Sequence, residues 1–134
     1  MKRRVSVIAV LIMFLAAGFV NGQAESGDKY VFVISKVNYL KAIEDAIDQS
    51  KAEGIELSEA RVIFCGESVK ALAEENAIVT KALQNKRIKF YACGLSLDQT
   101  KVDPALLPEN VSIVRNGILE AMKLEKEGYK KYDL

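Results

Sequence analysis

From residue 30 onward the sequence alternates short apolar runs with stretches of helical periodicity, and this alternation restricts the folds open to the chain. Continuous apolar runs are typical of strands that are buried on both faces of a sheet. Strands that alternate with helices imply parallel crossover connections. We therefore predict an α/β fold, a three-layer α/β/α sandwich with a mainly parallel sheet of four to five strands. The runs expected to form strands are residues 30–35, 60–65, 88–93, 111–114 and 129–132.

Capping and stop residues mark the ends of the predicted helices. Asn38 is placed to cap the first helix, and Gly54 supplies its C-terminal stop. The second helical stretch is expected to break near Asn76. The last helix should run over residues 117–127 and end at Gly128.

The amino terminus has the pattern of a secretory signal peptide. Three basic residues precede an uncharged run at 5–20, and Gly22 and Ala24 then occupy the small positions of a cleavage site. The alternative is a retained anchor, but 16 residues fall short of the ~20 that a spanning helix needs. We expect cleavage after Ala24, a periplasmic or secreted single domain at 25–134, and membrane contact only through an uncleaved segment.

Composition excludes several classes of function. The chain has no histidine, which rules out Ser-His-Asp and Cys-His catalysis and His-ligated metal sites. Its two cysteines are too few for a four-thiolate zinc site in one chain, and no Gly-rich phosphate motif is present. A net charge of +1 provides no field that would gather nucleic acid. We therefore predict neither a metal nor a cofactor, and no nucleic-acid partner.

The two cysteines occupy equivalent places in the predicted sheet. Cys65 and Cys93 each end a strand, and each is followed by a glycine, Gly66 or Gly94. Ligands of open α/β sheets bind at the carboxyl ends of the strands. Glycine at these positions lets the backbone turn sharply and approach a bound group. The predicted candidate site therefore lies at this edge of the sheet.

Cys93 also lies just before a predicted helix. Ser96 and Gln99 form a capping-box pattern, so the positive helix amino terminus would favour the thiolate of Cys93. Lys36, at the end of the first strand, is a second candidate positive contributor. The competing interpretation is that Cys93 is a small buried apolar residue.

Several segments together resemble the DsrE/DsrF-like family, which includes YchN-like proteins. They are residues 91–97, 106–108, 111–114, 117–120 and 128–129, and the resemblance extends over about residues 30–132. It implies a three-layer α/β/α domain that assembles into homo-oligomers, often trimers or hexamers. Some members carry sulfur as a persulfide on a strand-end cysteine, which here corresponds to Cys93. A sulfur-donor or sulfur-acceptor protein would then be the partner of a sulfurtransferase-like carrier.

The second cysteine leaves three hypotheses open. Cys65 could act as a resolving thiol beside a persulfide on Cys93. The family's sheet order puts the second and third strands side by side, so Cys65 and Cys93 could instead form a structural disulfide in a non-catalytic oligomeric binding module. The third hypothesis is a thiol-disulfide redox protein that uses the pair across the strands.

Overall fold

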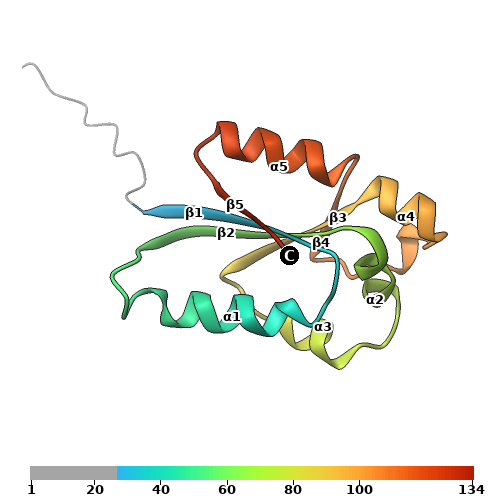
Figure 1. Ribbon diagram of the computed structural model, residues 1–134. Helices are drawn as coiled ribbons and strands as arrows, with labels where there is room; N and C mark the ends of the chain where they lie inside the picture. The colour runs from blue at the N-terminus through green and yellow to red at the C-terminus, as the bar shows by residue number, and fades with distance from the viewer. Residues whose placement is uncertain (1–26) are drawn as a thin grey trace, which may run out of the picture.

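A computed structural model describes residues 27–134, which form a five-stranded, all-parallel sheet (Figure 1). The strand order is β4-β3-β2-β1-β5. The predicted signal peptide at 1–24 lies outside the described residues. The strands are β1 (Asp28–Ile34), β2 (Leu57–Phe64), β3 (Ile88–Cys93), β4 (Val111–Val114) and β5 (Lys130–Asp133).

Helices cover both faces of this sheet. In Figure 1, α5 lies over one face, and α1 and α3 lie over the other. The connections from β1 to β4 all step in one direction across the sheet, whereas the connection from β4 to β5 steps back. Right-handed crossovers therefore place α5 opposite the earlier helices. The predicted three-layer α/β/α sandwich is confirmed. The helices are α1 (Tyr39–Ser50), α2 (Lys70–Ala73), α3 (Ala77–Ala82), α4 (Gly94–Thr100) and α5 (Gly117–Lys126), with 3₁₀ turns at Gly66–Val69 and Pro104–Leu106.

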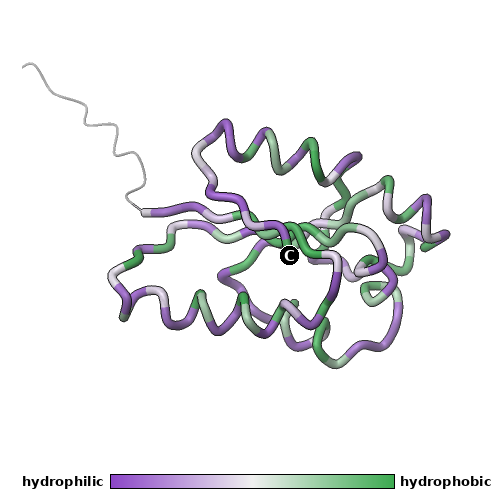
Figure 2. The backbone as a smooth tube through the Cα atoms, in the orientation of Figure 1, coloured by the Kyte–Doolittle hydropathy of each residue, from purple (hydrophilic) through white to green (hydrophobic). Residues whose placement is uncertain are grey.

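Two hydrophobic cores, one on each face, flank the sheet. Side chains alternate along a strand, so Phe64 of β2 joins the larger core and Ile63 joins the core under α5. On β3, Ala92 belongs to the larger core and Tyr91 packs against the α5 core. Figure 2 shows hydrophobic residues concentrated along the central strands, and hydrophilic and hydrophobic residues alternating along the helices. The alternation directs the next side chain of β3, Cys93, to the α5 face.

The predicted break at Asn76 and the predicted glycines after the first and last helices are present. The break at Asn76 is present, because its side chain accepts hydrogen bonds from the first amides of α3. Gly54 and Gly128 adopt φ angles of +76° and +98° after α1 and α5. The predicted cap at Asn38 is wrong. Asn38 precedes α1 but has helical φ and ψ and makes no side-chain cap hydrogen bond.

No helix between residues 27 and 134 combines the length and apolar character that crossing a bilayer requires.

Candidate functional site

Both cysteines lie at the carboxyl end of the sheet on neighbouring strands. Cys93 is the last residue of β3, and Cys65 directly follows β2. The preceding residues, Phe64 and Ala92, are paired across the two strands, so Cys65 and Cys93 occupy corresponding positions at the ends of these strands. Cys93 is buried, with 5% of its surface exposed, and Cys65 is partly exposed. Both are free thiols. The adjacency expected from the sheet order is thus present.

A third element, the amino terminus of α5, completes the site. The Gly117 amide donates a hydrogen bond to Cys93 Sγ over 3.2 Å. A Cβ atom at residue 117 would lie 2.6 Å from Cys65 Sγ and 3.1 Å from Cys93 Cβ. The first turn of α5 can therefore rest against both cysteines only because residue 117 is glycine.

Asn116 leaves the Gly117 amide available for this bond. The Asn116 side chain accepts hydrogen bonds from the amides of Ile118 and Leu119, at 3.0 and 3.2 Å. It therefore satisfies the next two amides of the helix, while the first is directed at Cys93. The sulfur consequently meets the positive end of the α5 dipole as well as one N–H donor.

Ser96 and Gly66 join the turn after Cys65 to α4. The Gly66 amide donates to Ser96 Oγ over 2.8 Å, and Ser96 is among the groups that lower the pKa of Cys93. The capping-box prediction for Ser96 and Gln99 is wrong, because α4 begins at Gly94 with Cys93 as its N-cap. Ser96 lies inside the helix, and its hydroxyl accepts from the Gly66 amide instead of capping α4.

Gly94 holds the β3–α4 junction against the segment that precedes α5. A Cβ atom at residue 94 would lie 3.1 Å from the Val114 carbonyl oxygen and 3.2 Å from that of Arg115. The adjacent Leu95 amide donates to the Arg115 carbonyl over 3.2 Å. This close approach fixes the position of Gly117 relative to Cys93.

The pKa values of the two thiols shift in opposite directions. Burial raises the pKa of Cys93, but hydrogen bonds from Ser96, Gly117 and Cys65 outweigh burial and hold that pKa below its ordinary value. The pKa of Cys65 rises to about 12, first through burial and then through the charge and hydrogen bond of Cys93. Cys93 is therefore the more readily ionised of the two thiols.

Lys36 does not contribute to the site as predicted. It is exposed and lines an open groove with Asn38, Glu67 and Glu74. It is not among the groups that account for the pKa of either cysteine. The α5 amino terminus supplies the positive field that we assigned to Lys36.

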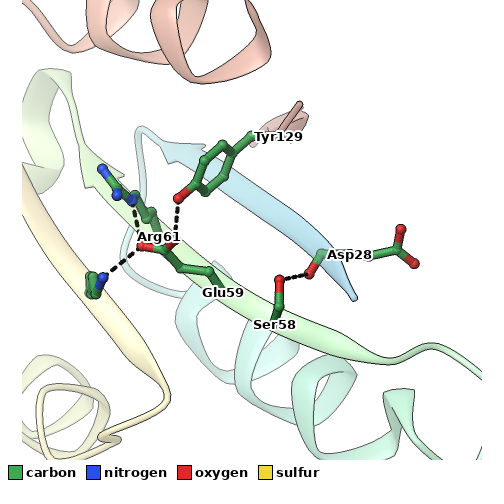
Figure 3. Close-up of polar contacts among 6 residues, drawn as sticks. Asp28, Ser58, Glu59, Arg61 and Tyr129 are labelled. Carbon is green, nitrogen blue, oxygen red and sulfur yellow. Dashed lines mark hydrogen bonds and ion pairs between the residues drawn. The ribbon is translucent and has the colours of Figure 1, made fainter. Parts of the chain in front are cut away.

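A second polar cluster lies on the α5 face, away from the thiols (Figure 3). Glu59 accepts hydrogen bonds from Arg61, Lys89 and Tyr129. Although burial opposes it, this bonding lowers the pKa of Glu59 to about 2. The Arg61 guanidinium also lies over the rings of Tyr91 and Tyr129, at 5.4 and 5.1 Å from their centroids. The cluster ties β2 and β3 to the segment after α5, and its charged groups are paired with one another, so we assign it a structural role.

Gly117 and Asn116 are the site residues that sequence reasoning missed. The signal for them was available, since an asparagine followed by glycine stands between a predicted strand and a predicted helix. Unlike Gly66 and Gly94, which directly follow the cysteines, Gly117 lies three residues after the end of its strand. Among residues 27–134, no group of three or more Cys, Asp and Glu side chains is arranged to hold a metal ion.

Solved structures share this fold. A protein of unknown function from Methanobacterium thermoautotrophicum aligns with a TM-score of 0.66 and 18% identity, over 80% of this chain and 99% of that one. A conserved protein of unknown function from Bacteroides thetaiotaomicron gives 0.58 and 18%, over 80% and 95%. The ychN protein from E. coli gives 0.57 and 12%, over 79% and 99%.

These likenesses confirm, at the level of the fold, the resemblance seen in the sequence. No family model matches this sequence, and no curated protein matches it.

Proposed function

We propose that this chain, which has a DsrE/YchN-like fold, is an exported carrier of sulfane sulfur that holds the sulfur as a persulfide on Cys93. One observation carries the proposal: the Gly117 amide, at the positive end of α5, donates a hydrogen bond to the Cys93 sulfur. That contact stabilises the thiolate, which is the nucleophilic form of cysteine. No histidine is needed to activate a thiol that ionises in this way.

The proposed transfer balances without an external oxidant or reductant. The Cys93 thiolate attacks the terminal sulfur of a donor persulfide, R–S–SH. A new S–S bond forms at Cys93, the donor's S–S bond breaks, and R–S⁻ leaves with the electron pair. An acceptor thiolate then attacks the terminal sulfur on Cys93 and returns Cys93 to the thiolate. The donor and the acceptor are the proposed protein partners.

Intact-mass measurement tests the proposal. The reduced protein, incubated with glutathione persulfide, should gain about 32 Da, the mass of one sulfur atom. Peptide mapping should place this mass on Cys93. Cys65→Ser should also gain it and Cys93→Ser should not. Absence of the added mass, or its persistence in Cys93→Ser, would overturn the assignment.

The disulfide alternative is supported by the placement of both sulfur-bearing side chains against Gly117. A Cys65–Cys93 bond in the exported protein would make the domain a binding or assembly module with no thiolate. Thiol titration of freshly exported protein without reductant distinguishes the two. Two free thiols support the carrier and reject the disulfide. A redox role through the same pair is the third candidate, and a reduction potential well below about −300 mV would make it implausible.

Export and assembly complete the proposal. Sequencing of the exported protein from its amino terminus should begin at Glu25 if the signal peptide is removed after Ala24.

We also propose a homo-oligomer. Exposed apolar side chains on α5 support a contact between copies, since Ile118, Leu119 and Met122 are 65%, 48% and 57% exposed.

A further inference from the structure

We infer that Cys65 and Cys93 together form a binding site for one soft monovalent cation, Cu(I), which their two sulfur atoms hold in a linear S–Cu–S arrangement. The inference goes beyond the proposed sulfur transfer and does not depend on it. The composition of the chain excludes His-ligated and four-thiolate metal sites, and a site of two thiolates belongs to neither class.

The two cysteines are neighbours across parallel strands and face the same way. Phe64 pairs with Ala92, so Cys65 and Cys93 are the next residues in register. Both have extended backbones, with φ and ψ of −125° and 162° at Cys65 and −74° and 115° at Cys93. The alternation of side chains therefore continues through both residues and directs them to the face covered by α5.

The first residue of α5 lies against both side chains. A Cβ atom at residue 117 would lie 2.6 Å from Cys65 Sγ and 3.1 Å from Cys93 Cβ. Cys65 also packs against the hydrophobic core under α5. The Gly117 amide donates to Cys93 Sγ over 3.2 Å. Two sulfur-bearing side chains thus converge on one backbone position.

The spacing of neighbouring strands suits a metal ion with two sulfur ligands. Strands in a sheet lie about 4.8 Å apart. A metal–thiolate bond is about 2.3 Å long, so a linear unit of two such bonds spans about 4.6 Å. Both cysteines are free thiols. An ion between them therefore requires no displacement of either strand.

The donor set determines which metal the site prefers. Thiolates are soft ligands that select Cu(I), and two thiolates in a line satisfy this d¹⁰ cation. Structural Zn²⁺ sites require four ligands. Among residues 27–134, no third Cys, Asp or Glu side chain is arranged with this pair to hold an ion. The site therefore favours Cu(I) over Zn²⁺.

The surroundings of the pair suit the charge of the complex. Each thiol releases its proton on binding, copper remains Cu(I), and the bound unit carries a net charge of −1. The Gly117 amide and the positive end of the α5 dipole stabilise that negative charge. Cys65 is partly exposed, whereas Cys93 has 5% of its surface exposed. The ion therefore reaches Cys65 from solvent and is shielded from water at Cys93.

Competition for Cu(I) tests the inference. The reduced protein should remove one Cu(I) per chain from its coloured complex with bicinchoninate. Cys65→Ser and Cys93→Ser should each weaken binding by more than about 100-fold, the most that losing a group bound only to a ligand typically costs. Ser58→Ala, at the opposite end of β2, is the control and should bind as the unsubstituted protein does. Full affinity in either cysteine variant, or one Cu(I) per two chains, would overturn the inference.

X-ray absorption of the copper-loaded, unsubstituted protein gives a test that does not depend on the folding of any variant. It should show two sulfur neighbours around copper and no nitrogen or oxygen neighbour. A third ligand of any kind would contradict the two-thiolate site.

The Cys65→Ser variant separates copper binding from sulfur transfer. It should lose Cu(I) binding but still gain one sulfur atom on Cys93 from glutathione persulfide. If the unsubstituted protein binds Cu(I) and no protein gains sulfur, the proposed function fails and the copper site stands. If sulfur is gained and no Cu(I) binds, the copper site alone is rejected.

Discussion

The amide of Gly117 donates a hydrogen bond to the sulfur of Cys93 over 3.2 Å, across 24 residues of sequence. The bond joins the last residue of β3 to the first residue of α5. It places a buried sulfur atom against a helix N-terminal amide that the Asn116 cap does not bind, and this amide stabilises negative charge on the sulfur. The chemistry proposed for Cys93 depends on this contact more than on any other.

Substitution Gly117→Ala should disturb both thiols at once. The added methyl group would lie 2.6 Å from Cys65 Sγ, so either Cys65 or the start of α5 must move. We expect a loss of about 1–3 kcal/mol in the free energy of unfolding and slower alkylation of Cys93 at pH 7. Denaturant melts and alkylation rates measure the two effects.

Gly54→Ala is the matched control for that substitution. Gly54 has a φ of +76°, and no heavy atom lies within 4 Å of the place that an alanine methyl group would take. Alanine there strains the backbone without touching the thiols. It should lower stability and leave Cys93 alkylation unchanged. If Gly117→Ala also left alkylation unchanged, the Gly117 amide would have no part in activating Cys93.

Asn116 should affect reactivity beyond its effect on helix stability. Asn116 and Asn76 cap α5 and α3 in the same way, each accepting from two backbone amides. Asn116→Ala and Asn76→Ala should each cost about 1 kcal/mol of unfolding free energy. Only Asn116→Ala should slow the alkylation of Cys93, because only α5 begins at that sulfur. Equal alkylation rates in the two variants would contradict this role of Asn116.

Glu59 should make the protein sensitive to acid. Its pKa is about 2 in the folded chain and 4.5 as the reference value, so its stabilisation is complete above pH 4.5 and disappears as the pH falls towards 2. Glu59→Gln should lose up to about 3 kcal/mol at pH 7. The difference from the unsubstituted protein should vanish near pH 2.

Urea melts between pH 2 and pH 7 measure this dependence. Glu109→Gln, at an exposed position, serves as the control and should match the unsubstituted protein throughout. A Glu59→Gln penalty that did not change with pH would show that the carboxylate charge is not what stabilises the cluster.

A charge on the outer face of α5 should disrupt the proposed oligomer. Met122 is 57% exposed, on the helix that covers one face of the sheet. Met122→Glu should reduce the molar mass measured by light scattering to that of one chain, because burying an unpaired carboxylate in a contact between copies is costly. Lys123→Glu provides a charge control on the same helix. A monomeric unsubstituted protein would refute the proposal.

Periodicity was sufficient to predict the sheet. Buried parallel strands are continuous apolar runs. The helices between them are bounded by residues with specific roles: Asn76 caps the start of α3, and Gly128 adopts a positive φ after α5. The cap predicted at Asn38 is wrong because it was inferred from the residue type alone, and the backbone of Asn38 is already helical. Capping depends on φ and ψ, which a single residue type does not determine.

The site was predictable only in part. Adjacent strand-end cysteines follow from the order of the sheet, so Cys65 and Cys93 could be placed together. The groups that stabilise the Cys93 thiolate could not be predicted. Gly117 lies on the crossover between β4 and β5, and Ser96 lies inside α4. Such contacts depend on how two helices pack at one edge, and local sequence patterns do not encode that packing. The predicted contribution of Lys36 to the site failed for the same reason.

Competitive alkylation of the reduced protein tests the central claim most directly. A limiting amount of iodoacetamide at pH 7, followed by peptide mass mapping, reports which cysteine is the thiolate. We predict modification of Cys93, with Cys65 unmodified although it is the more exposed of the two. Preferential modification of Cys65, or equal modification of both, would contradict the claim.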